Sequence, residues 1–187
     1  MPTTIGRKTV DEYFETEFAS DGYYEYINGQ TIEMDWETVL HNEIVQNLFI
    51  AVFARFKDPE CRVCSRRTRL KVAEPIGYLH PDVCLARAPQ SYEPDRRDTM
   101  LNPFMVFEVM SESTESNDRG CKFNLYRNID SLQYYVLISH DEVLVESFSR
   151  QPNGQLLGER FVGLDAVVPF EALNWKLRLS ELYRDIE

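Results

Sequence analysis

Two carboxylates stand inside segments that otherwise have the apolar character of buried β-strands. Asp82 lies near the start of residues 81–86, and Glu108 is the single charged residue of residues 103–110. Burying an unpaired charge is costly, so each carboxylate needs a compensating partner. An arginine or the start of a helix could pair with either one alone. A hard divalent cation such as Mg²⁺ prefers carboxylate oxygens and would compensate both together.

The elements that would position these carboxylates are predicted from periodicity and turn residues. Apolar residues recur every three or four positions over residues 37–56, which predicts a long helix packed on a sheet. Asn28-Gly29 separates two β-prone runs, residues 23–27 and 30–34, and predicts a tight hairpin because both turn residues tolerate positive φ. Further helices are expected at residues 9–19, 117–128 and 181–186, the first opened by a capping box of Thr9 and Glu12 and the last capped by Ser180. Further strands are expected at residues 61–72, 133–139, 142–149 and 159–162, with a long surface loop at residues 88–102.

This order of elements predicts an α/β fold. A mixed central β-sheet would be flanked by α-helices, with a helix and a β-hairpin at the N-terminal end. The length of 187 residues fits one domain of ordinary size, so residues 1–187 are expected to form a single domain. Because no apolar run approaches the roughly 20 residues of a membrane helix, and residues 1–10 contain no signal peptide, we expect a cytoplasmic protein without membrane contact.

The charge of the chain bears on its partners. The net charge of −11, from 31 acidic and 20 basic residues, is unfavourable for binding phosphate groups. Within residues 62–71, however, Arg67, Arg69 and Lys71 alternate with uncharged residues and would share one face of a strand. They could contact a phosphate backbone, or form a solvated face balanced by nearby acids, which the overall charge slightly favours. The aromatic residues show no pattern typical of a stacking platform for single-stranded bases.

Several short motifs follow one another along the chain. They are Tyr24-Glu25-Tyr26-Ile27-Asn28-Gly29, His41 seven residues after Met34, Pro81-Asp82-Val83, Phe107-Glu108-Val109-Met110-Ser111, and Asp118-x-x-x-Lys122-x-x-x-Tyr126. Through their order and spacing, the chain resembles a large bacterial restriction endonuclease family of the PD-(D/E)xK nuclease superfamily over nearly its whole length. The resemblance implies a restriction-endonuclease-like fold and metal-dependent hydrolysis of phosphodiester bonds, with DNA as the expected nucleic-acid substrate.

The resemblance also implies a role for each matched residue. Asp82 and Glu108 would bind Mg²⁺ or Mn²⁺, with the carbonyl of Val109 completing the metal site. Glu25 would lie near the metal and could hold a metal-bound water. Lys122 would orient or activate the attacking water.

Two further residues are candidates for accessory roles. His41 could reach the edge of the site, or it could be a partly buried histidine satisfied by a backbone group. Asp118 could join the site, or it could form a surface i, i+4 pair with Lys122. A homodimer is expected, because nucleases of this kind often act as dimers on two-stranded targets.

An inactive protein of the nuclease fold, acting as a binding or interaction module, is the alternative function. The superfamily's motif lysine, two residues after the glutamate, would fall at Met110, which cannot replace it. The negative net charge also favours this alternative. Retention of all four matched catalytic residues favours the nuclease, because an unused buried charge costs stability.

Overall fold

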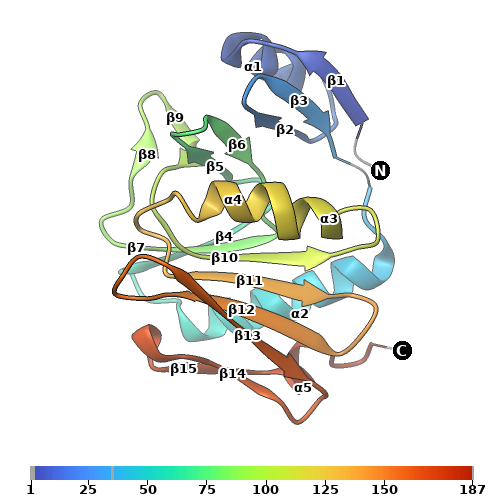
Figure 1. Ribbon diagram of the computed structural model, residues 1–187, viewed down its shortest axis with the longest axis vertical. Helices are drawn as coiled ribbons and strands as arrows, with labels where there is room; N and C mark the ends of the chain where they lie inside the picture. The colour runs from blue at the N-terminus through green and yellow to red at the C-terminus, as the bar shows by residue number, and fades with distance from the viewer. Residues whose placement is uncertain (1–2, 35, 187) are drawn as a thin grey trace.

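Residues 3–34 and 36–186, the part of the chain that the computed structural model describes, contain two large β-sheets and one small one (Figure 1). The seven-stranded sheet has the order β1 (Thr3–Arg7), β3 (Gln30–Glu33), β2 (Tyr24–Ile27), β6 (Gly77–Leu79), β5 (Arg69–Val72), β9 (Arg96–Met100) and β8 (Tyr92–Glu93). The six-stranded sheet has the order β13 (Leu156–Val162), β12 (Leu144–Arg150), β11 (Tyr134–Ser139), β10 (Pro103–Met110), β7 (Val83–Arg87) and β4 (Cys61–Ser65). The small sheet pairs β14 (Val167–Phe170) with β15 (Trp175–Arg178). The six-stranded sheet is mixed, because β10 and β11 are parallel while its other neighbours are antiparallel.

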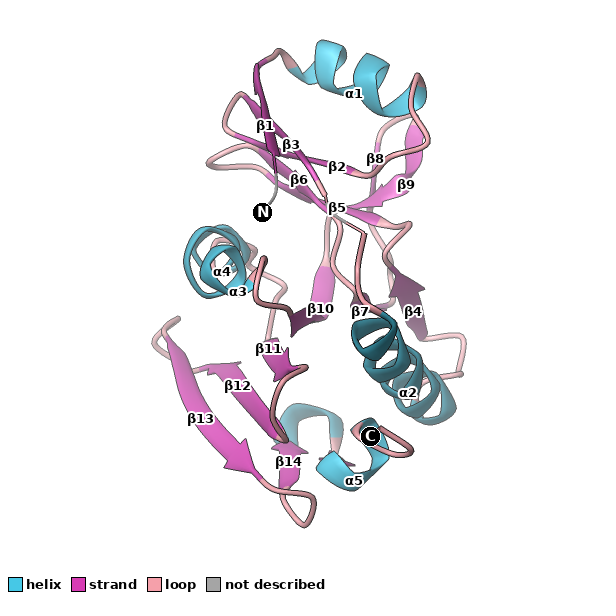
Figure 2. Cartoon of the chain, turned by 90° about the vertical axis from the view of Figure 1, so that its right-hand side faces the viewer, coloured by secondary structure: helices cyan, strands magenta, loops and turns pink. Residues whose placement is uncertain are grey.

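Helices cover both faces of the six-stranded sheet, as Figure 2 shows. One face carries α2 (Val39–Arg55), and the other carries a continuous helical segment made of α3 (Glu115–Asn117), a π-helical turn η1 (Asp118–Lys122) and α4 (Phe123–Tyr126). Because side chains alternate along a strand, odd-numbered residues of β7 and β10 pack with α2 and even-numbered ones pack with α4. This is the α/β arrangement of a mixed sheet between helices that the sequence predicts.

Local signals in the sequence correctly predict the N-terminal elements. α1 (Val10–Phe18) begins after Thr9, and Thr9 and Glu12 form the expected capping box. The hairpin of β2 and β3 turns at Asn28 (φ 47°) and Gly29 (φ 90°). α2 is also present, but it begins after its N-cap Thr38, two residues later than expected.

Other expectations are wrong. Residues 88–102 are not a loop, because β8 and β9 form a hairpin that turns through Asp95 at a φ of 63°. The last helix, α5 (Leu179–Leu182), begins earlier than expected, and its N-cap is Arg178, so Ser180 lies inside the helix rather than capping it. The sequence did not predict β1, β6, β14, β15 or the short 3₁₀ turn η2 (Glu171–Leu173). No helix within the described ranges is both long enough and apolar enough to cross a membrane.

The two large sheets meet where the chain leaves β6 and enters β7. The link is His80-Pro81-Asp82, and all three residues are buried. Short strands that start and end here bring side chains from both sheets to one place. The predicted site residues lie at this junction.

Candidate active site

Asp82, directly before β7, lies opposite Glu108 on the neighbouring strand β10. In the antiparallel pairing of β7 with β10, Phe107 is opposite Val83, and continuing the register by one step places residue 108 opposite residue 82. Glu108 shares its strand face with Val106, whose side chain packs toward α4. Both carboxylates are buried, with 5% of Asp82 and 3% of Glu108 exposed.

Lys122 joins this pair from the π-helical turn. Its Nζ lies 3.2 Å from Oε1 of Glu108, 3.1 Å from Oε1 of Glu25 and 3.3 Å from Oδ1 of Asp118. These four side chains are all almost completely buried. The site therefore combines carboxylates from both large sheets with a cation from the helical layer, and Asp118 belongs to it rather than to a surface pair.

The π-helical turn η1 presents both Asp118 and Lys122 to the sheet. The two residues are its first and last members, and they pair at the i, i+4 spacing. Tyr135, on β11, donates a hydrogen bond from its hydroxyl to the backbone oxygen of Asp118 at 3.0 Å and so ties the turn to the sheet. Such widened turns occur frequently at functional sites.

The electrostatics reflect a surplus of negative charge. Burial raises the pKa of Glu108 well above its ordinary value; Lys122 opposes this rise, while Asp118, Asp82 and Glu25 add to it. Burial alone would lower the pKa of Lys122, but Glu108, Glu25 and Asp118 outweigh it and raise that pKa well above its ordinary value. Lys122 is therefore held in its charged form, while Glu108 tends to keep a proton.

Asp82 is held by different partners. Its Oδ2 accepts a hydrogen bond from the backbone N–H of Val109 at 2.8 Å and lies 3.3 Å from Nε2 of His41. Burial would raise the pKa of Asp82, but His41 outweighs this and lowers it. Burial would lower the pKa of His41, but Asp82 and then Glu37 raise it. The first turn of α2 thus brings His41 into the site, with an acid rather than a backbone group as its partner.

Two further residues hold carboxylates of the site. The Tyr126 hydroxyl donates to Oε1 of Glu108 at 2.9 Å, and the His80 backbone N–H donates to Oε1 of Glu25 at 3.1 Å. Tyr126 follows Lys122 by four residues, so helical periodicity could have placed both on one face. His80 directly precedes Pro81-Asp82, but its contact with Glu25 joins residues 55 positions apart, so no local spacing predicts that contact.

The basic residues expected on one strand face divide between β5 and the turn before it. Arg67 lies in that turn and is exposed. Arg69 and Lys71 stand two residues apart on β5 and so share one face. Arg69 is 5% exposed and pairs with Glu17 and Asp98, and Lys71 pairs with Glu93. A face shared by all three cations is therefore wrong for Arg67, whereas balance by nearby acids, the alternative that the overall charge favours, is confirmed for Arg69 and Lys71.

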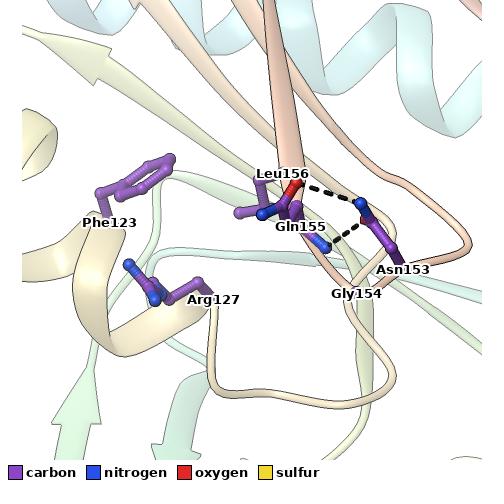
Figure 3. A pocket seen from close by; sticks show the side chains of 6 residues that line it. All are labelled: Phe123, Arg127, Asn153, Gly154, Gln155 and Leu156. Atoms are coloured by element: carbon purple, nitrogen blue, oxygen red, sulfur yellow. Dashed lines mark hydrogen bonds between the residues drawn. The ribbon is translucent and has the colours of Figure 1, made fainter.

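The site opens into a small cavity lined by Asp82, Glu108, Asp118 and Lys122, among others. Its volume of about 10 Å³ has room for about one water-sized particle. A larger hollow of about 460 Å³ lies elsewhere, between Phe123, Arg127 and residues 153–156 (Figure 3). Its described lining residues include no carboxylate, so the chemistry belongs to the smaller cavity.

The donors at the site fit a hard divalent cation. Oxygen ligands suit Mg²⁺ and Mn²⁺, and Oε2 of Glu25 has no hydrogen-bond partner in the described part of the chain. Four carboxylates contact one lysine and one histidine, with Arg66 also lining the cavity, so a further positive charge would reduce the repulsion between the carboxylates. Among residues 3–34 and 36–186, however, no three His, Cys, Asp or Glu side chains already form a metal-binding group. The carboxylates are arranged around Lys122 instead.

Comparisons with known proteins place the chain in a family. Two proteins of Synechocystis sp. (strain ATCC 27184 / PCC 6803 / Kazusa) are similar to this chain over most of their length. "Uncharacterized protein sll1609" is 28% identical over 166 residues, covering 89% of this chain and 94% of the relative. "Uncharacterized protein slr1290" is 29% identical over 178 residues, covering 94% of this chain and 91% of the relative.

A solved structure has the same fold. It is the crystal structure of a "putative nuclease belonging to DUF820" from Anabaena variabilis ATCC 29413, which matches with a TM-score of 0.71 and 18% identity over 88% of this chain and 91% of that one. The model of the family Uma2, described as "Putative restriction endonuclease", matches residues 10–180. Because that match spans nearly the whole chain and includes every residue of the buried cluster, the protein belongs to the Uma2 restriction endonuclease family.

Proposed function

We propose that this protein is a metal-dependent nuclease that hydrolyses phosphodiester bonds of nucleic acid, with DNA as the expected substrate. The observation that carries the proposal is the buried Lys122, whose Nζ lies within 3.3 Å of Glu25, Glu108 and Asp118. A buried charge cluster costs stability, and a protein that used it only for folding could replace it with apolar residues. Function is the better explanation for keeping it.

Each residue would have a distinct task. Asp82 and Glu108 would hold Mg²⁺ or Mn²⁺, with the Val109 carbonyl as a further oxygen donor. The ion, when bound, would neutralise charge on the phosphoryl oxygens and make water a better nucleophile. Glu25 would hold a water beside Lys122. The raised pKa of Lys122 keeps it protonated, so it would orient the water and stabilise negative charge rather than accept a proton.

Supporting residues would keep the two metal-binding carboxylates in place. Tyr126 donates to Glu108, and His41 and the Val109 backbone N–H hold one oxygen of Asp82. Such outer contacts orient the ligands of a metal site. Met110 stands where the superfamily has its lysine. Its presence is compatible with catalysis, because Lys122 brings an ammonium to Glu108 from the helical layer.

Cleavage of DNA by the purified protein tests the proposal. Supercoiled plasmid and single-stranded circular DNA are incubated with Mg²⁺ or Mn²⁺, and with EDTA in parallel. We expect metal-dependent cleavage that Asp82→Asn, Glu108→Gln and Lys122→Met each abolish. Glu43→Gln and Lys176→Met remove charges that are exposed on the surface, so these matched controls should cleave like the wild type.

Calorimetry separates metal binding from cleavage. The wild type should bind Mg²⁺ or Mn²⁺, and the Asp82→Asn, Glu108→Gln double variant should not. Equal metal binding by both proteins, together with no cleavage of either DNA, would support the binding module instead. The homodimer expected from the resemblance stays a prediction, which light scattering on the purified protein would test.

A further inference from the structure

Trp36 is the most exposed large apolar side chain of the described residues, with 90% of its surface accessible. A fully exposed tryptophan contributes little to folding, because its apolar surface stays in water. It stands just before α2, whose first turn carries His41 of the candidate active site. A side chain of this size at such a place needs an explanation other than packing.

Trp36 lines a hollow of about 360 Å³ that adjoins the catalytic cavity. The hollow also contains Tyr23, Asn42 and Arg66, so it combines two aromatic rings with an amide and a guanidinium. Its size lies within the range of small-molecule sites, about 300–1,000 Å³. Met34, Glu37 and Arg66 line both this hollow and the catalytic cavity, which places the two side by side.

Arg66 is the cation between the two spaces. Its guanidinium lies 5.7 Å from the centre of the Tyr23 ring, and its Nη2 lies 3.6 Å from Oε1 of Glu37. Its Nε is buried and has no hydrogen-bond partner among the described residues. A guanidinium that lines the hollow beside aromatic rings is suited to the polar edge of a base or to the phosphate attached to it.

We propose that this hollow binds an unpaired nucleobase of the substrate, stacked on Trp36, next to the phosphate that is cleaved. The inference rests on the proposed nuclease function and names its substrate class: single-stranded or locally unpaired nucleic acid. The catalytic cavity has room for about one water-sized particle, so a base cannot enter it and must lie outside. The hollow is where the neighbouring base would go.

The charge of the protein favours this substrate over an intact duplex. Stacking does not depend on charge, so it suits a protein with a net charge of −11. A duplex carries the higher density of phosphate charge, and its bases already stack on one another. Glu33 and Glu37, which also line the hollow, would repel a second phosphate backbone.

Fluorescence of Trp36 tests the inference. The Asp82→Asn protein, which should not cleave, is titrated with oligothymidylate of about 12 nucleotides, within the usual site size of about 4–16, and with a blunt duplex of equal length. We expect the single strand to quench tryptophan emission to saturation and the duplex to leave it unchanged. The quenching should vanish in the same protein carrying Trp36→Phe, because Trp175 is the other tryptophan and stacks on Phe170 within the fold.

Affinity is measured in parallel by anisotropy of fluorescein-labelled oligothymidylate. Trp36→Ala should weaken binding by about 5- to 150-fold, the range expected for loss of one base–aromatic stack, and Trp36→Phe should retain most of it. Phe53→Ala is the matched control, since Phe53 is also exposed (51%) but lies 12 residues beyond His41 on α2, about 18 Å along the helix.

The outcomes separate this inference from the proposed function. No binding of oligothymidylate, binding that leaves Trp36 emission unchanged, equal affinity for the duplex, or an unchanged affinity of Trp36→Ala would each overturn the stacking site. Metal-dependent plasmid cleavage that Trp36→Ala leaves intact would also overturn it, while the nuclease would stand. Quenching of Trp36 by the single strand without any cleavage would leave the stacking site standing and refute the nuclease.

Discussion

Replacing Lys122 by methionine should lower the free energy of unfolding of the protein, unless another cation takes the place of the lysine ammonium. Methionine has a similar shape but leaves Glu25, Glu108 and Asp118 buried without their shared partner. Breaking a buried ion pair costs about 3–5 kcal/mol of unfolding free energy. With a urea slope of about 2 kcal/mol per M, the unfolding midpoint should fall by about 1.5–2.5 M.

The pH dependence of this loss follows from the same charges. Without Lys122, the pKa values of Glu108 and Asp118, which burial already raises, rise further above those of the unfolded chain. The native state then binds more protons than the unfolded state, so stability falls as pH rises above the ordinary carboxyl range. The deficit of Lys122→Met in EDTA should therefore be larger at pH 8 than at pH 5, where the carboxyl groups are more easily protonated.

Urea unfolding followed by circular dichroism measures these effects. Lys176→Met is the control, since Lys176 is exposed and its loss should change little. Adding Glu108→Gln to Lys122→Met should recover part of the stability, and Mg²⁺ should stabilise Lys122→Met. An unfolding free energy of Lys122→Met within about 1 kcal/mol of the wild type, or an equal deficit at both pH values, would refute the electrostatic reasoning.

Four smaller perturbations test other parts of the structure. Thr38→Ala removes the cap of α2 and should cost about 1 kcal/mol in urea unfolding. Arg69→Met removes a buried guanidinium from Glu17, which is 11% exposed, and from Asp98, which is 47% exposed, and should cost about 1–3 kcal/mol, with Arg67→Met near zero as its control. Gly29→Ala, at a φ of 90°, should lower stability by about 1–2 kcal/mol, and an unchanged melting temperature would contradict the hairpin geometry. Tyr126→Phe removes the hydrogen bond to Glu108 and should weaken Mg²⁺ binding in calorimetry by about 10-fold while the fold stays intact.

Local sequence signals correctly predicted the elements that are stabilised by residues close to one another in the chain. The capping box at Thr9, the Asn28-Gly29 turn and the apolar periodicity of α2 predicted their elements because caps, turns and helical faces are short-range. The strand β10 was predicted with its observed bounds, because an apolar run of this length needs burial on both faces.

Elements that depend on distant partners were missed or misplaced. β9 is polar and exposed in part, and it is a strand because it pairs with β5 and β8. β6 has only three residues and exists through its pairing with β2 and β5. The alternation of Arg69 and Lys71 did not reveal that their partners, Asp98 and Glu93, lie on the two strands of the unpredicted hairpin of β8 and β9.

For the site, residue types and their positions along the chain indicate which residues to consider, whereas the way these residues meet depends on tertiary packing. Asp82 and Glu108 stand out in the sequence because each is a carboxylate in an otherwise apolar segment, and burying a charge requires a compensating partner. The meeting of Glu25 with Lys122 depends on strand register, on the junction of two sheets and on the π-helical turn. The exposure of Trp36 beside the cavity also depends on how the elements pack together. These are long-range consequences of packing, and no spacing in the chain encodes them.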